Sequence, residues 1–247
     1  MSRLPRLPDL LTTANLSCGV ASILLASQGQ LTIACGLVFL AALFDVLDGL
    51  AARALGGGSE FGKQLDSLAD MVSFGVAPMF AVLFTLRWPP LGNLEQVIWL
   101  PLLLAAIPIA SAWRLAKFNV DARQREGFLG LPTPFNALFW VSVCLATQHV
   151  PLYGMLNSSK LEFAIAQLVI WPSLPIMVIG LSGLMLSSLP LPSLKFKHYR
   201  WRGNEVIYCL LLAACCLLLL YGVLAVPLIL IIYLLSPLWG RLLPKPA

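Results

Sequence analysis

The sequence predicts an all-α, polytopic membrane protein: a helix bundle of about eight transmembrane helices, in which a six-helix core is followed by a C-terminal pair. Of its 247 residues, 59% are hydrophobic and only 11% are charged, whereas soluble domains carry about a quarter charged side chains. Apolar runs at 31–43, 100–109, 164–170 and 206–235 are too many and too long for one small water-soluble core. The bilayer is therefore the expected solvent.

Each helix is expected where an apolar window of about 20 residues is bounded by proline, glycine or charged residues. Gly222 and Pro227 interrupt the last apolar run, which leaves open a hairpin or one long broken helix, and hence a count of seven. The eight expected helices are, in order, 11–28, 31–55, 62–87, 96–118, 132–149, 162–188, 204–221 and 223–241.

The chain is expected to form one membrane domain over 1–247, with 205–241 as a helix pair within it. Six cysteines fall in apolar stretches without metal-ligand spacing, which favours a packing role. The N-terminal residues contain two arginines but no short apolar stretch with a small-residue cleavage site, so no removed signal peptide is expected.

The basic residues predict the orientation, because lysine and arginine collect on the cytoplasmic side of membrane proteins. With both termini in the cytoplasm, only Arg87 and Lys160 fall outside. The same pattern accounts for the net charge of +5 without nucleic-acid binding, which we do not expect. The residues expected inside are Arg3, Arg6, Arg53, Lys63, Arg114, Lys117, Arg123, Arg125, Lys195, Lys197, Arg200, Arg202, Arg241 and Lys245.

Carboxylates inside the second apolar window are the first sign of function, because a charged aspartate near a bilayer costs several kcal/mol unless it meets water, a metal or a partner. Asp45, Asp48, Gly49 and Ala52 stand at i, i+3, i+4 and i+7, on one stripe of a helix, and Arg53 lies beside that stripe.

The next helix repeats the pattern, with Gly62, Asp66 and Asp70 at i, i+4 and i+8 on one face. The linker ALGGGSEF is short, so the two helices should be antiparallel neighbours with opposed acidic faces near the cytoplasmic surface. Its three glycines are expected to form a flexible turn.

Four converging carboxylates repel one another unless cations neutralise them, and the absence of nearby His or Cys favours Mg²⁺ or Mn²⁺ over Zn²⁺. Two such ions suit displacement at phosphorus. Gly49, Ala52 and Gly62 leave room for a flat base or a diphosphate, and Arg53 can donate to a phosphate. The structural alternative is that the aspartates form salt bridges with Arg53 and Lys63. Two cations for four aspartates would leave an excess of negative charge, which disfavours this alternative.

The run Asp48-Gly49-x-x-Ala52-Arg53, eight residues, Gly62, three residues, Asp66, three residues, Asp70 is similar to the signature of the CDP-alcohol phosphotransferase family at every position. This resemblance implies a homodimer with two metal ions. It also implies the site residues: Asp45, Asp48, Asp66 and Asp70 as metal ligands, Asp70 also as general base, and Gly49, Ala52, Arg53 and Gly62 as the cytidine and diphosphate pocket, with Thr12 and Asn15 reaching the cytidine.

Further stretches resemble the bacterial phosphatidylserine synthase branch of that family. They are LPDLLTTANLSCG, EFGKQLDSLADMVSFGVAP, RLAKFNVD, FLGLPTP and LMLSSLPLPSLKF. The resemblance implies transfer of a phosphatidyl group from CDP-diacylglycerol to L-serine in a bacterial cytoplasmic membrane, with the active site facing the cytoplasm. Arg114, Lys117 and Asn119, at the end of the fourth helix, and Ser73, one turn after Asp70, are candidate acceptor-binding residues.

Several alternatives stay open at this point. The acceptor can be glycerol 3-phosphate, inositol phosphate or choline, or the donor an archaeal-type ether lipid. A cation transporter would also place aspartates in a membrane, although these acids lie near helix ends and the chain has no evident inverted repeat. A two-step route through an enzyme-bound intermediate is a further option, although no obvious nucleophile lies beside the acids.

Overall fold

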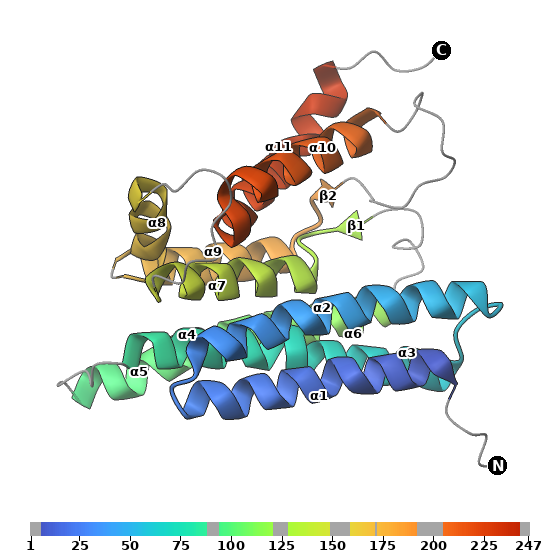
Figure 1. Cartoon of the computed structure of the whole chain (residues 1–247), viewed down its shortest axis with the longest axis horizontal. Coiled ribbons are helices and arrows are strands. Elements are labelled where there is room, and N and C mark those ends of the chain that lie inside the picture. The colour runs from blue at the N-terminus through green and yellow to red at the C-terminus, as the bar shows by residue number, and fades with distance from the viewer. Residues whose placement is uncertain are drawn as a thin grey trace.

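The computed structural model describes residues 6–87, 94–120, 128–148, 159–170, 172–191 and 205–242. Within them the fold is a layered helix bundle with one two-stranded contact (Figure 1), which confirms the predicted all-α class. The first layer holds the N-terminal half of the chain. It consists of α1 (Leu7–Ser27), α2 (Leu31–Ala54), α3 (Glu60–Asp70), the π-helical segment η1 (Met71–Val76), α4 (Ala77–Arg87), α5 (Leu94–Leu104) and α6 (Ala106–Val120).

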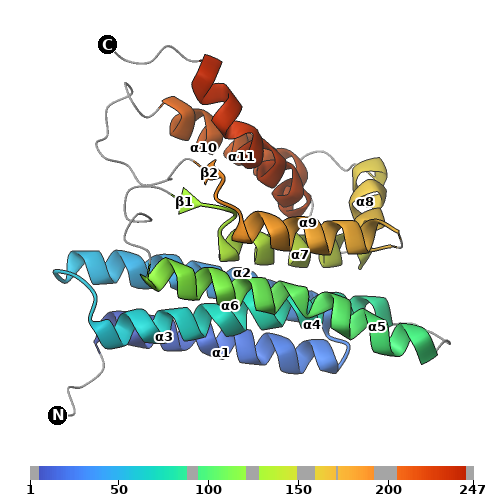
Figure 2. The ribbon, with the colours of Figure 1, turned by 180° about the vertical axis from the view of Figure 1, so that it is seen from behind.

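A second layer, made mainly of α7 (Thr133–Thr147) and α9 (Ser173–Leu186), lies against this bundle (Figures 1 and 2). Here α7 contacts α2 and α4, while α9 contacts α6. The remaining elements border or cover this layer: α8 (Ser159–Ala166), η3 (Gln167–Val169), α10 (Glu205–Tyr221), η4 (Gly222–Leu224), α11 (Ala225–Leu242), and the antiparallel strands β1 (Phe128–Leu129) and β2 (Pro190–Leu191).

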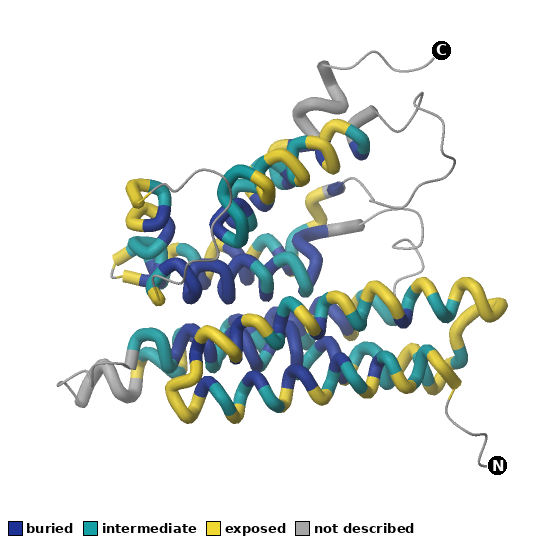
Figure 3. The backbone as a smooth tube through the Cα atoms, in the orientation of Figure 1, coloured by how far each residue is buried: buried dark blue, intermediate teal, exposed yellow. Residues whose placement is uncertain are grey.

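The centre of the molecule is α7, which is buried without interruption from Phe139 to Ala146 (Figure 3). A helix that is apolar and buried on every side belongs to the interior of a bundle and not to its lipid-facing surface. Trp140 is the largest fully buried side chain of this core.

Five helices are long and apolar enough to cross a membrane, or six if one bent pair counts as a span. They show a polytopic membrane protein, but the predicted count of eight is not confirmed. One reason is α7, which is apolar but only 15 residues long. By length and composition the candidate spans are Leu7–Ser27, Leu31–Ala54, Glu60–Leu86, Trp99–Val120 and Ile207–Ser236, with Ser159–Val169 plus Ser173–Leu186 as the bent pair. Ile207–Ser236 is an unbroken helical run in the chain, but it comprises α10 and α11, which fold back on each other.

The single helix expected at 162–188 is wrong, because α8 with η3 meets α9 at an angle of 78°. Pro172 stands directly before α9 and has no N–H to continue a helical ladder from the preceding turn. The apolar window at 162–188 could not predict this bend, because average hydropathy carries no information on the direction of the chain.

The last apolar run forms a hairpin, which resolves the alternative left open by the sequence. Leu210 of α10 and Tyr233 of α11 belong to one buried cluster and line one cavity, so the two helices pack against each other. The chain reverses at Gly222, whose φ of 58° lies in the left-handed region that favours glycine.

The expected helix 62–87 is one continuous span in which η1 inserts a π-helical segment directly after Asp70. The expected helix 96–118 is interrupted at Ala105, because Pro108 cannot donate to the carbonyl of Leu104. The linker at 55–59 is a turn in which Gly56 and Gly57 have positive φ.

Most of the described basic residues that were expected inside lie near one end of the bundle, at the start of α1 and α3 and towards the end of α2 and α6 (Figure 1), whereas Arg114 is buried in the middle of α6. The others expected there, Arg3, Arg123, Arg125, Lys195, Lys197, Arg200, Arg202 and Lys245, lie outside the described residues, and the side chain of Arg241 is not described.

Candidate active site

Three of the four predicted acidic residues converge between α2 and α3. One carboxylate oxygen from each of Asp45, Asp48 and Asp66 lies within 4.8 Å of the other two. Asp48 is only 6% exposed, and the Oδ1 atom of Asp66 is buried without a hydrogen-bond partner. Among the described residues, no lysine or arginine forms an ion pair with these carboxylates, so the salt-bridge alternative has no support there.

The first helix supports this cluster from the side. Thr12 Oγ1 donates to Asp48 Oδ2 at 2.7 Å, and the same hydroxyl lies 3.0 Å from the carbonyl of Pro8, one turn earlier. Thr12 is buried, so α1 fixes one oxygen of Asp48 from a helix 36 residues away in sequence.

Asp70 lies deeper along α3, only 8% exposed. Its Oδ1 atom accepts a hydrogen bond from Nδ2 of Asn15 at 3.2 Å, and Ser73 Oγ donates to the carbonyl of Asn15 at 2.9 Å. Oδ1 of Asn15 is buried and has no partner. Asn15 of α1 therefore orients the Asp70 carboxylate. The same residue also accepts the hydrogen bond from Ser73 of η1, the π-helical segment that follows Asp70.

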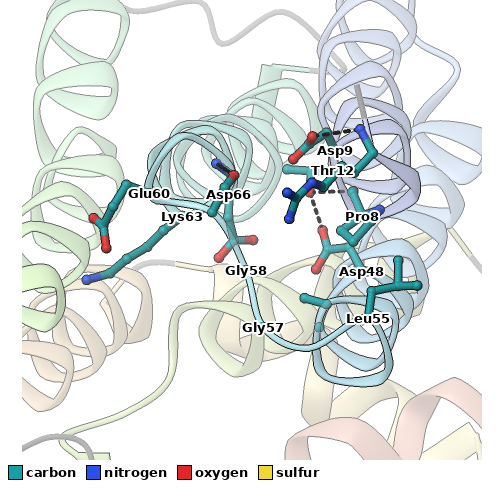
Figure 4. A pocket seen from close by; sticks show the side chains of 15 residues that line it. Pro8, Asp9, Thr12, Asp48, Leu55, Gly57, Gly58, Glu60, Lys63 and Asp66 are labelled. Atoms are coloured by element: carbon teal, nitrogen blue, oxygen red, sulfur yellow. Dashed lines mark hydrogen bonds between the residues drawn. The ribbon is translucent and has the colours of Figure 1, made fainter. Parts of the chain in front are cut away.

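A pocket of about 320 Å³ opens beside the acidic cluster, between α1, α2, α3 and their linker (Figure 4). The figure shows Asp48 and Asp66 directed into the space that Thr12 borders from α1. Its lining residues are Arg6, Pro8, Asp9, Thr12, Asp48, Gly49, Ala52, Leu55, Gly57, Gly58, Ser59, Glu60, Gly62, Lys63 and Asp66.

The small residues predicted for the nucleotide, Gly49, Ala52 and Gly62, all line this pocket. A Cβ added at Gly62 would lie 3.0 Å from Asp9 Oδ1 and 3.2 Å from Ser59 Oγ, so the glycine keeps this wall open. Arg53 is exposed and is not among the lining residues, although its Nη1 atom would stand 3.6 Å from a Cβ at Gly49.

The ends of α1 and α3 shape the mouth of the pocket. Ser59 is the N-cap of α3 and its hydroxyl accepts from the backbone N–H of Gly62 at 2.9 Å, which is the bond expected of a serine at that position. Asp9 accepts from the backbone N–H of Arg6 at 2.9 Å, in the first turn of α1.

Arg6 and Asp9 were not among the residues singled out from the sequence, nor were Ser59 and Lys63 as binding residues. The sequence positions of Arg6 and Lys63 do not distinguish them from ordinary cytoplasmic anchors. Ser59 could have been found from the sequence, because a serine that follows a glycine turn and precedes a helix is a typical N-cap.

The candidate acceptor residues do not line this pocket. Asn119 donates from Nδ2 to Ser67 Oγ at 2.8 Å, and Lys117 is exposed. Arg114 differs from both, because it is only 7% exposed and its Nη1 atom donates to Thr133 Oγ1 of α7 at 3.1 Å. It is also close enough to Asp70 to interact with it electrostatically.

The two stretches FLGLPTP and LMLSSLPLPSLKF, distant in sequence, meet in the fold. Gly130 N donates to the carbonyl of Leu189 at 2.9 Å, and Leu131 N donates to that of Leu184 at 3.0 Å. These bonds hold the start of α7, and with it Thr133, against the end of α9. The end of the second stretch, 192–196, lies outside the described residues.

Comparison with known proteins agrees with this architecture. The family model described as CDP-alcohol phosphatidyltransferase matches residues 6–179. A CDP-diacylglycerol–serine O-phosphatidyltransferase of Mycobacterium leprae is 36% identical over 196 residues, 75% of this chain and 57% of that protein. An archaetidylserine synthase of Methanothermobacter thermautotrophicus is 38% identical over 166 residues, 66% of this chain and 66% of that protein.

A CDP-diacylglycerol–serine O-phosphatidyltransferase of Bacillus subtilis is 31% identical over 170 residues, which are 67% of this chain and 89% of that protein. The chain thus spans less than two thirds of the Mycobacterium leprae and Methanothermobacter relatives, but most of the Bacillus relative.

Fold and site together define a polytopic membrane protein with a carboxylate cluster facing a pocket. The chain belongs to the CDP-alcohol phosphatidyltransferase family, as its aspartate signature predicted.

Proposed function

We propose that this protein transfers a phosphatidyl group from CDP-diacylglycerol to L-serine, giving phosphatidylserine and CMP. The observation that carries the proposal is the cluster of Asp45, Asp48 and Asp66 beside a pocket that the small residues Gly49, Ala52 and Gly62 help to line. Family membership supports the reaction class, and the names of the Mycobacterium and Bacillus relatives support serine as acceptor.

The carboxylates fit a site for two divalent ions, Mg²⁺ or Mn²⁺. All donors are oxygens, three of them lie within 4.8 Å of one another, and a buried oxygen of Asp66 lacks any partner. We assign Asp45, Asp48 and Asp66 as ligands, with Asp70 completing the set. When bound, such ions neutralise charge on a diphosphate and stabilise the leaving group.

Asp70 is proposed as the general base. The Asn15 amide holds its Oδ1 atom, and so fixes the carboxylate in one orientation toward the incoming hydroxyl. The serine oxygen attacks the lipid-linked phosphorus as its proton passes to Asp70, an O–P bond forms, and the P–O bond to CMP breaks. This displacement needs no covalent enzyme intermediate.

The donor is proposed to enter the pocket between α1 and α3 with its cytidine diphosphate against Gly49, Ala52 and Gly62. Thr12 and Asn15 approach from α1, and Arg53 reaches a phosphate from the rim. The lipid tails would extend along apolar helix faces, in a bacterial cytoplasmic membrane with the site and both termini on the cytoplasmic side. A homodimer is the expected assembly.

The test is CMP release by purified protein in detergent, with CDP-diacylglycerol and Mn²⁺ or Mg²⁺. We expect release to depend on L-serine and to fall by about 10²–10⁴ in Asp70→Asn, because a general base contributes on that scale. Release that requires glycerol 3-phosphate, inositol phosphate or choline instead would reject serine and retain the family chemistry. No release with any acceptor, and no stabilisation by CMP, would favour a cation transporter.

A second donor deserves the same assay. The archaetidylserine synthase relative is named for an ether-lipid product, so CDP-archaeol should be compared with CDP-diacylglycerol. We expect the ester lipid to be preferred, and a higher kcat/KM for CDP-archaeol would assign the ether lipid as donor.

A further inference from the structure

A second polar cluster lies outside the lining of the nucleotide pocket, at the start of α7. It consists of Arg114 of α6 with Thr133 and Asn136 of α7, all buried. Thr133 and Asn136 are three residues apart and so share one face of the helix. The bond from Arg114 to Thr133 places the guanidinium at the N-terminus of α7.

Most of the hydrogen-bonding capacity of this cluster is unused. The Nε and Nη2 atoms of Arg114 are buried without a partner, and so are both amide atoms of Asn136. Buried polar groups are nearly always hydrogen-bonded in native proteins, and a buried guanidinium without acceptors is costly. The cluster therefore has the donors of a ligand site, and its ligand must supply acceptors.

The unused guanidinium atoms define the shape of that ligand. Nε and Nη2 form one edge of the planar guanidinium, with two parallel N–H groups that match the two oxygens of a carboxylate. Thr133 occupies Nη1 and fixes the plane. The first turn of α7 has no side-chain cap, so its N-terminus adds partial positive charge at the same place.

We propose that Arg114 and Asn136 bind the carboxylate of the acceptor amino acid and thereby select serine over alcohols without a carboxylate. This inference rests on the proposed function. In this proposal the acceptor lies between Arg114 and Asp70, which interact electrostatically, with its carboxylate on the guanidinium and its hydroxyl toward the base. Tyr233 of α11, which is buried, also interacts electrostatically with Arg114.

The experiment compares L-serine with L-serinamide, which keeps the hydroxyl and the amine but replaces the carboxylate with a neutral amide. In the wild type we expect a preference for serine in kcat/KM. Arg114→Gln should lower that preference about 10- to 100-fold, mainly through the KM for serine, as expected for loss of a charge-assisted hydrogen bond. Asn136→Ala should lower it several-fold, with little change for serinamide.

Folding and catalysis are monitored separately. CMP-dependent thermal stabilisation reports the pocket of α1–α3 and should be unchanged in both variants. Ser142→Ala is the matched control, because Ser142 is also buried on α7 but donates to the carbonyl of Phe139. It should leave the preference for serine unchanged.

An unchanged preference for serine in a folded, active Asn136→Ala protein would overturn the inference, even if Arg114→Gln failed to fold. A wild type that uses glycerol 3-phosphate, with Arg114→Gln impairing that reaction, would also overturn it and assign the cluster to a phosphate. A wild type that releases no CMP with any acceptor rejects the proposed function itself, which is a different outcome.

Discussion

At Gly19, α1 lies close against η1, the segment that follows Asp70, and we predict that Gly19→Ala disrupts the site. Gly19 packs directly on Ser73 of η1, and an added Cβ would stand 2.8 Å from the Cα atom of Ser73. Favourable carbon contacts require about 3.5–4.0 Å, so the two segments must separate by about 1 Å.

That separation has a calculable consequence. Asn15 donates to Asp70 at 3.2 Å, close to the upper limit for a hydrogen bond. An additional 1 Å breaks the bond, which costs about 0.5–1.5 kcal/mol, and the overpacking itself costs about 1–3 kcal/mol. We therefore expect Gly19→Ala to lower the free energy of unfolding by about 2–4 kcal/mol and to reduce CMP release.

Thermal unfolding in detergent and CMP release measure the two effects. Gly36→Ala on α2 is the matched control, since a Cβ there meets nothing within 4 Å and alanine favours a helix over glycine by about 0.5–1 kcal/mol. Adding Ser73→Gly to Gly19→Ala should restore only part of the stability, because the Cα atom of Ser73 remains. A Gly19→Ala protein as stable and active as the wild type would refute the packing argument.

Two further substitutions test the supports of each cluster. Thr12→Val removes the donor to Asp48 and should raise the Mn²⁺ concentration for half-maximal CMP release about 10- to 100-fold, the usual effect of losing a ligand's hydrogen-bond partner. Thr13→Val, which removes only an exposed bond to the carbonyl of Asp9, should not. Gly130→Ala should lower the free energy of unfolding by about 2 kcal/mol or more, because φ is 73° and a Cβ would lie 2.7 Å from the carbonyl of Met185. Thermal unfolding measures this loss, and Gly180→Ala, with open space around its Cβ, should show none.

The convergence of Asp45, Asp48 and Asp66 could be predicted from the sequence because the information for it is local. Asp45 and Asp48 share a face by helical spacing, and a short glycine turn brings Asp66 opposite them. The helix expected at 31–55 is observed as Leu31–Ala54, since hydropathy and a glycine boundary define it. Such features depend on residues within one or two helices, so no knowledge of tertiary packing was required.

The features that escaped prediction depend on packing between distant segments. The bonds from Thr12 to Asp48 and from Arg114 to Thr133 link different helices, and their existence depends on crossing angles that hydropathy does not encode. Arg114 and Lys117 were given one role because both end the same helix. In the fold α7 covers Arg114, while Lys117 one turn farther on is exposed.

Asp70 is linked to both clusters, because it accepts a hydrogen bond from Asn15 of α1 and interacts electrostatically with Arg114 of α6. Its own helix becomes π-helical immediately afterwards, and π-helical turns occur often at functional sites. If donor and acceptor bind as proposed, substitutions at Thr12 should change metal dependence without altering the choice of acceptor, and those at Asn136 should do the reverse. Only changes at Asp70 should affect both the metal dependence and the choice of acceptor, because the proposed proton transfer to Asp70 accompanies the attack of the acceptor on the donor.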